Sequence, residues 1–216
     1  FLNGEIDDIM ARVMVDELVK TARRPFVAEN RPGDEGHHGA EFVARARPDG
    51  NTLLFAPIVQ YAAAASLFPL HYDLVTDFTP VTLVANAQQA LVAHPSLPVK
   101  SVSELIAFAK SRPGQFKWGS HYDNRLSGLQ ISMFRLLSEI TTDSTAYRDS
   151  DAVLPELLAG RVVLLFDSMF ATLPHIKSGR LRALAVSGSQ RSAVLSQTPT
   201  VAQAGLKGFE ADNWYA

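Results

Sequence analysis

The chain has 216 residues, of which 47% are hydrophobic and 19% are charged, and it contains no cysteine. This composition supports a folded core in one large or two small domains. The formal net charge of −2 gives no reason to expect nucleic acid or an anionic membrane surface as a partner. The lack of cysteine excludes disulfides and thiolate metal sites, and no apolar run in the sequence is long enough to span a bilayer.

The first half of the chain alternates helix and strand signals. Asp7 and Asp8 precede apolar residues at helical spacing, and the Pro48–Gly50 turn separates a short helix from an apolar strand. The expected elements are a helix from Asp7 to Leu18, a strand at Pro25–Ala28, a short helix at Ala40–Ala46, a strand at Thr52–Ala56, a helix at Tyr61–Phe68 and a long extended segment at Thr79–Ala93.

The same alternation continues in the second half. Ser101 and Glu104 have the spacing of a capping box, and Gly160 is placed to end a helix. The expected elements are a helix from Ser101 to Lys110, a strand at Phe116–Trp118, a helix at Ser127–Glu139, a strand at Thr145–Tyr147, a helix at Asp151–Ala159, and strands at Arg161–Phe166 and Leu181–Ser187. Alternating strands and helices predict an α/β fold.

Several motifs, in order along nearly the whole chain, give a more specific indication. They are Glu29–Gly33 with Gly36 and Gly39, Pro48–Phe55, Asp77–Val81, His94–Ser101, Arg112–Gly114, Leu173–Val186 and Pro199–Gly205. Their residues and spacing resemble those of the periplasmic substrate-binding receptors of tripartite tricarboxylate transporters, often called Bug receptors.

The resemblance implies a two-lobed fold of the type II periplasmic-binding-protein class, with a ligand cleft between two Rossmann-like lobes. On this basis we expect residues 1–92, with 213–216, in the first lobe and residues 93–212 in the second. The crossings between the lobes would lie near Leu91–Ala93 and Glu210–Trp214. Compared with the family, the chain begins late in the first strand and stops early, so we expect an incomplete chain whose first lobe is the less stable; the alternative is a naturally truncated relative.

Ligands of open α/β sheets lie at the carboxyl ends of strands, where helix N-termini favour anions. Four loops of this kind are Leu2–Asp8, Pro57–Gln60, Ser120–Ser127 and Asp167–Met169. The resemblance implies that the first and third bind a small carboxylate. The predicted ligand-binding residues are Asn3, Gly4, Glu5, Asp8, Ile58, Gly119, Ser120, His121, Tyr122, Arg125, Asp167 and Ser168.

The chain departs from the family where the ligand would bind. Glu5 replaces a glycine, and His121, Tyr122 and Arg125 stand where the family has small residues. Either these three residues remodel the pocket, or they point to solvent or fill a cleft that no longer binds the usual ligand. In the first case Arg125 or His121 recognises an anion, and Glu5 accepts a hydrogen bond from an amine, amide or hydroxyl of the ligand.

Other sites have weaker support in the sequence. Ser120, His121 and Asp123 are too close together to form a hydrolase triad, and no nucleophile elbow is present, so we expect no enzyme. His37 and His38 lack metal-ligand spacing and are expected in a solvated loop. The glycines Gly33, Gly36 and Gly39 do not match a dinucleotide motif.

The predicted function is therefore that of an extracytoplasmic solute receptor. It would capture a small organic acid or related polar metabolite and deliver it to membrane permease subunits, without a cofactor or metal. The receptor is expected in the periplasm and as a monomer. The alternative is a relative that has lost transport and serves as a sensory or scaffold module.

Overall fold

A computed structural model describes residues 6–31, 36–57, 61–63, 65, 69–121, 125–148 and 150–216. The chain divides into two compact units: unit 1 comprises residues 1–85 and 214–216, and unit 2 comprises residues 86–213. The chain passes from unit 1 to unit 2 within β1 (Ala85–Ala87) and returns to unit 1 within β7 (Asn213–Tyr215). These two strands pair with each other in a two-stranded sheet.

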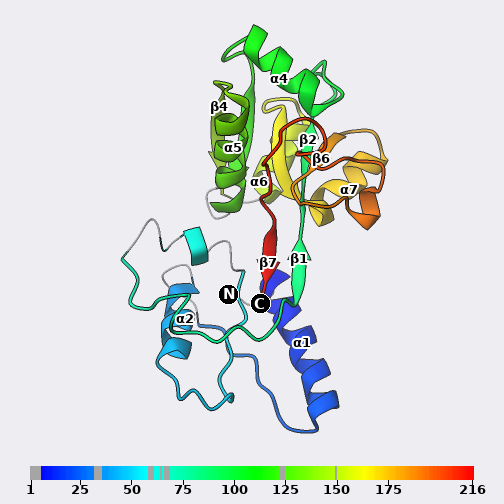
Figure 1. Cartoon of the computed structure of the whole chain (residues 1–216). Coiled ribbons are helices and arrows are strands. Elements are labelled where there is room, and N and C mark those ends of the chain that lie inside the picture. The colour runs from blue at the N-terminus through cyan, green and yellow to red at the C-terminus, as the bar shows by residue number, and fades with distance from the viewer. Residues whose placement is uncertain are drawn as a thin grey trace. The chain divides into compact units, whose positions relative to one another are not determined.

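Unit 2 is built on a five-stranded mixed sheet in the order β4-β3-β5-β2-β6 (Figure 1). Strand β3 runs parallel to both β4 and β5, whereas β2 runs antiparallel to both β5 and β6. The strands are β2 (Gln89–Ala93), β3 (Lys117–His121), β4 (Asp143–Tyr147), β5 (Leu164–Ser168) and β6 (Arg182–Val186).

Helices cover both faces of this sheet. The larger core cluster joins one face to α4 (Val102–Ser111) and α5 (Arg125–Ser138), and the second cluster joins the other face to α6 (Ser150–Leu158) and α7 (Met169–Lys177). A short 3₁₀ helix follows at Ala193–Leu195. The result is a three-layer α/β/α arrangement.

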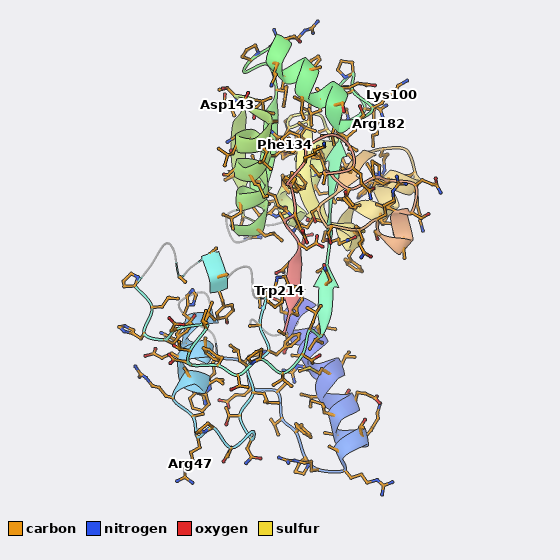
Figure 2. The ribbon with its side chains drawn as sticks, in the orientation of Figure 1. Arg47, Lys100, Phe134, Asp143, Arg182 and Trp214 are labelled. Atoms are coloured by element: carbon orange, nitrogen blue, oxygen red, sulfur yellow. The ribbon has the colours of Figure 1, made fainter. Side chains whose placement is uncertain are left out.

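Four aromatic rings form the centre of the larger cluster. Trp118 stacks on Phe166 with 5.8 Å between ring centroids, and Phe166 stacks on Phe209 at 5.7 Å. Phe134, which projects from α5 (labelled in Figure 2), contacts Trp118 edge to face at 5.4 Å and is fully buried. These rings fix the position of α5 over β3 and β5.

Helix ends in unit 2 follow the local sequence. Ser101 caps α4 by accepting a hydrogen bond from the Glu104 N–H at 3.1 Å, while the Glu104 carboxylate accepts one from the Lys100 N–H at 2.8 Å. Gly160 follows α6 with φ of 73°, a conformation that glycine adopts without strain. The predicted capping box and helix stop are confirmed.

Unit 1 contains α1 (Ile6–Ala22) and α2 (His37–Ala44), and residues 61–63 are also helical. Among the residues that the structure describes, the buried core cluster of unit 1 consists of Ala40, Ala56, Tyr61 and Tyr72, with half-buried apolar residues such as Leu54 and Phe78 packed against it. The predicted strand at Pro25–Ala28 is wrong, since these residues form no strand. Thr52–Ala56 forms none either, and only the adjacent Pro57 makes an isolated bridge, to Tyr215.

The boundary between the two compact units lies a few residues from the expected lobe boundary, and the assignment of the units as lobes stays a prediction. Leu91–Ala93, expected at a crossing, are fully buried in β2, because this strand pairs along its length with β5 and β6. The first crossing therefore lies earlier, at residues 85 and 86, and the second lies at residues 213 and 214.

Candidate functional site

Two neighbouring strands of unit 2 end in polar residues at the same edge of the sheet. Trp118 of β3 pairs with Leu164 of β5 in a parallel ladder, so His121 and Asp167, each three residues further on, end at one edge. Trp118 belongs to the core beneath α5, and alternation therefore directs Gly119 and His121 to the opposite face, which α6 covers. The sheet thus brings His121 and Asp167 together.

The two side chains are almost fully buried, each 2% exposed. His121 Nε2 lies 3.9 Å from Asp167 Oδ2, which is too long for a hydrogen bond but close enough for an ion pair when the imidazole is protonated. The interpretation that His121 points to solvent is wrong. The sequence placed it in a loop, whereas β3 continues through His121 and buries its ring.

Asp167 is held by one of its two carboxylate oxygens. Oδ1 accepts hydrogen bonds from the Ser150 hydroxyl at 2.8 Å and from the Ser168 N–H at 2.7 Å. Burial raises the pKa of Asp167, and the neighbouring His121 and these two bonds oppose the rise. The site therefore holds a poorly solvated carboxylate whose pKa depends on the neighbouring charges and hydrogen-bond donors.

Helix N-termini follow both strands. The Ser168 hydroxyl caps α7 by accepting from the Ala171 N–H at 3.2 Å, and α5 begins at Arg125, four residues after β3. Ser120 is buried on the α5 side of the sheet at 8% exposure. The edge thus combines buried polar side chains with the positive ends of two helices, which suits a small polar or anionic ligand.

Gly119 has a clear packing role. A Cβ at this position would lie 2.5 Å from Val153 Cγ2 of α6 and 3.2 Å from Val162 Cγ2. Only glycine lets α6 approach β3 this closely. This packing accounts for the glycine, and its predicted role in ligand binding stays a prediction.

Asp8 lies in unit 1, at the start of α1, and is 3% exposed. Its Oδ1 accepts a hydrogen bond from Asn30 Nδ2 at 2.7 Å and an ion-pair contact from Arg12 Nε at 3.0 Å. These contacts connect α1 to the segment around Asn30.

The predicted ligand-binding residues Asn3, Gly4, Glu5, Ile58 and Tyr122 lie outside the described residues, as does the side chain of Arg125.

The sequence did not single out three polar residues of this edge. Ser150 binds Asp167, the Ser127 hydroxyl accepts from the His121 N–H at 3.1 Å, and Gln89 starts β2 directly opposite Ser168. Ser150 had a weak signal as the first residue of α6. Gln89 had none, because nothing in the sequence indicated that β2 enters the sheet antiparallel beside β5.

His37 is buried in the core of unit 1, so the predicted solvated position is wrong for this residue. Its Nδ1 lies 2.6 Å from the Tyr72 hydroxyl, and its ring packs edge to face on Tyr61.

Within the described ranges, no three His, Asp or Glu residues lie close enough together to hold a metal ion. Among the helices that the structure describes, none has both the length and the apolar composition needed to cross a membrane.

Comparison with known proteins adds independent information. A family model described as "Tripartite tricarboxylate transporter family receptor" (TctC) matches residues 10–216. The chain is 34% identical over 221 residues to protein BugT of Bordetella pertussis, covering 100% of this chain and 67% of BugT. It spans about two thirds of the length of the curated relatives that it matches.

Solved structures of similar proteins match the whole chain. A Rhodopseudomonas palustris protein with adipate is 32% identical with a TM-score of 0.73, and MatC of the same organism, with bound malate, is 29% identical with a TM-score of 0.72. The periplasmic binding protein BugD is 28% identical with a TM-score of 0.73. The matches cover 100% of this chain and 73%, 74% and 72% of those chains, respectively. They confirm the predicted α/β fold of periplasmic solute-binding proteins.

Proposed function

Because the chain belongs to the tripartite tricarboxylate transporter receptor family, we propose that it captures a small organic acid or related polar metabolite in the periplasm and delivers it to membrane permease subunits. The family consists of periplasmic solute-binding receptors, not enzymes. We further propose that units 1 and 2 are the two lobes of such a receptor.

The observation that carries this proposal is the polar edge of the unit 2 sheet. Buried Ser120, His121 and Asp167, together with half-buried Ser168, lie where β3 and β5 end and helices begin. Similar proteins have been solved with adipate and with malate, which are small dicarboxylates. Helix N-termini and backbone N–H groups favour such ligands.

A thermal-shift screen of small organic acids on the full chain tests the proposal. A ligand present at about 100 times its dissociation constant stabilises the folded state by roughly 2.7 kcal/mol. For a protein of this size, that raises the melting temperature by about 5–10 °C. Malate, succinate, adipate and aspartate are the first compounds to test. No shift with any small acid, amide or amino acid would contradict the proposed function.

A further inference from the structure

One buried oxygen at the polar edge receives no hydrogen bond from the described residues. This atom is Oδ2 of Asp167, whose Oδ1 is bound by Ser150 and Ser168. The carboxylate is 2% exposed, so bulk solvent does not reach it freely. Leaving a buried charged acceptor without a donor costs on the order of 1–3 kcal/mol or more.

The same edge presents a second acceptor of this kind. Oε1 of Gln89, which lies opposite Ser168 at the start of β2, is buried and receives no hydrogen bond from the described part of the chain. An edge built to receive only carboxylates would present donors. This one presents a charged acceptor on β5, on the face that α6 covers, and a neutral acceptor on β2, on the face that α5 covers.

The electrostatics of Asp167 argue in the same direction. A ligand carboxylate close to Oδ2 would be repelled by the like charge, whereas a hydroxyl or ammonium group would supply the missing bond. Nε2 of His121 lies 3.9 Å from Oδ2, too far to donate a hydrogen bond to it, so Oδ2 remains an acceptor. The side chain therefore distinguishes ligands by whether they carry a donor.

We propose that Asp167, through Oδ2, accepts a hydrogen bond from a hydroxyl or ammonium group of the ligand, so that the preferred ligands are hydroxy or amino carboxylic acids and not the corresponding acids without a donor. This inference rests on the proposed function and names the ligand class of the same site. Asp167 is then a specificity-determining residue, whereas the helix N-termini hold the ligand carboxylates.

Calorimetry on the full chain with matched ligand pairs tests the inference. The pairs are malate and succinate, aspartate and succinate, and 2-aminoadipate and adipate, in which the members differ only by the donor group. The wild-type protein should bind the donor-bearing member of at least one pair about 10- to 100-fold more tightly, the scale of a hydrogen bond to a charged acceptor.

Asp167→Asn is the decisive variant. Its side-chain oxygen can keep the bonds from Ser150 and Ser168, while its NH₂ group replaces Oδ2 and turns the acceptor into a donor. The preference for the donor-bearing ligand should then disappear or invert. Asp151→Asn is the matched control, because exposed Asp151 raises the pKa of Asp167 through its charge alone. This control should keep the wild-type preference.

Circular dichroism and thermal melts establish that each variant is folded. If Asp167→Asn does not fold, Ser150→Ala replaces it: the carboxylate loses one anchoring bond, and the preference should fall without vanishing. Equal binding of both members of every pair by the wild-type protein would overturn the inference while leaving the proposed function intact, as would an unchanged preference in Asp167→Asn. Failure of all these acids to bind the wild-type protein would overturn the proposed function and this inference together.

Discussion

Units 1 and 2 differ in how completely their apolar side chains are buried and packed together. In unit 2, Trp118, Phe134, Phe166 and Phe209 pack on one another in a core between one face of the five-stranded sheet and helices α4 and α5. In unit 1, the described core has two alanines and two tyrosines, and Val27 is 86% exposed.

The difference shows what an apolar segment needs in order to become a strand. Leu164–Phe166 are apolar and fully buried because β2 and β3 flank them. Thr52–Ala56 have a similar composition, but Leu53 is 53% exposed and the segment forms no strand. Backbone N–H and C=O groups need partners, and a strand forms only where a neighbouring strand supplies them.

The largest expected effect is the loss of a ring from the core of unit 2. Phe134→Ala should destabilise unit 2 by about 3–5 kcal/mol, the usual cost of a large cavity. Denaturant titration of Phe134→Ala in a Trp214→Phe background follows unit 2 alone, because buried Trp118 is then the only tryptophan.

Unit 1 is the control for that measurement. With Trp118→Phe as the background, Trp214 reports on unit 1, and the unit 1 transition should move far less on Phe134→Ala. An equal loss of stability in both transitions would mean that the units unfold together, which would contradict the conclusion that their cores are separate.

A smaller effect is expected where α6 approaches β3. Gly119→Ala places a Cβ against Val153 and should destabilise unit 2 by about 1–3 kcal/mol through overpacking. Gly128→Ala is the matched control, since Gly128 lies within α5 with no atom near the added Cβ. It should stabilise the protein by about 0.5–1 kcal/mol. Similar thermal shifts for both variants would contradict the packing at Gly119.

Asp167→Asn should stabilise unit 2 at pH 7 by about 0.5–2 kcal/mol, because it removes a buried charge. Burial raises the pKa of folded Asp167 above its ordinary value of 3.8, so the folded state takes up this proton before the unfolded state does. The penalty is therefore present above the raised pKa and disappears as pH falls through it toward 3.8. Denaturant titrations between pH 7 and pH 3.5 measure this, and a stability difference that does not change with pH would be inconsistent with it.

The smallest expected effect lies in unit 1. The Tyr215 hydroxyl donates to Asp7 Oδ1 at 2.6 Å, and Tyr215→Phe should cost about 0.5–1.5 kcal/mol. Trp214 fluorescence in the Trp118→Phe background measures it. A change larger than that of Phe134→Ala would reverse the ranking of the two cores.

Local signals in the sequence were sufficient for most of unit 2. The Ser101 capping box, Gly160 and helical spacing predicted α4, α5 and α6 within a few residues. The antiparallel entry of β2 could not be predicted, because strand order depends on long-range pairing that leaves no local pattern.

The candidate site could be predicted only in part. Strand ends and family resemblance led to Ser120, His121, Asp167 and Ser168. Whether β3 ended at Trp118 or at His121 decided if the histidine was buried, and strand boundaries are the least certain feature of a sequence pattern. Ser150 and Gln89 reach the site through packing alone.

Titration of the ¹⁵N-labelled full chain with malate tests the proposed ligand site at the polar edge of unit 2 most directly. The largest chemical-shift changes in unit 2 should occur at the carboxyl ends of β3 and β5, in the amides of Gly119–His121 and of Asp167 and Ser168. Changes confined to the opposite ends of these strands, at Lys117 and Leu164, with none at the polar edge, would contradict it.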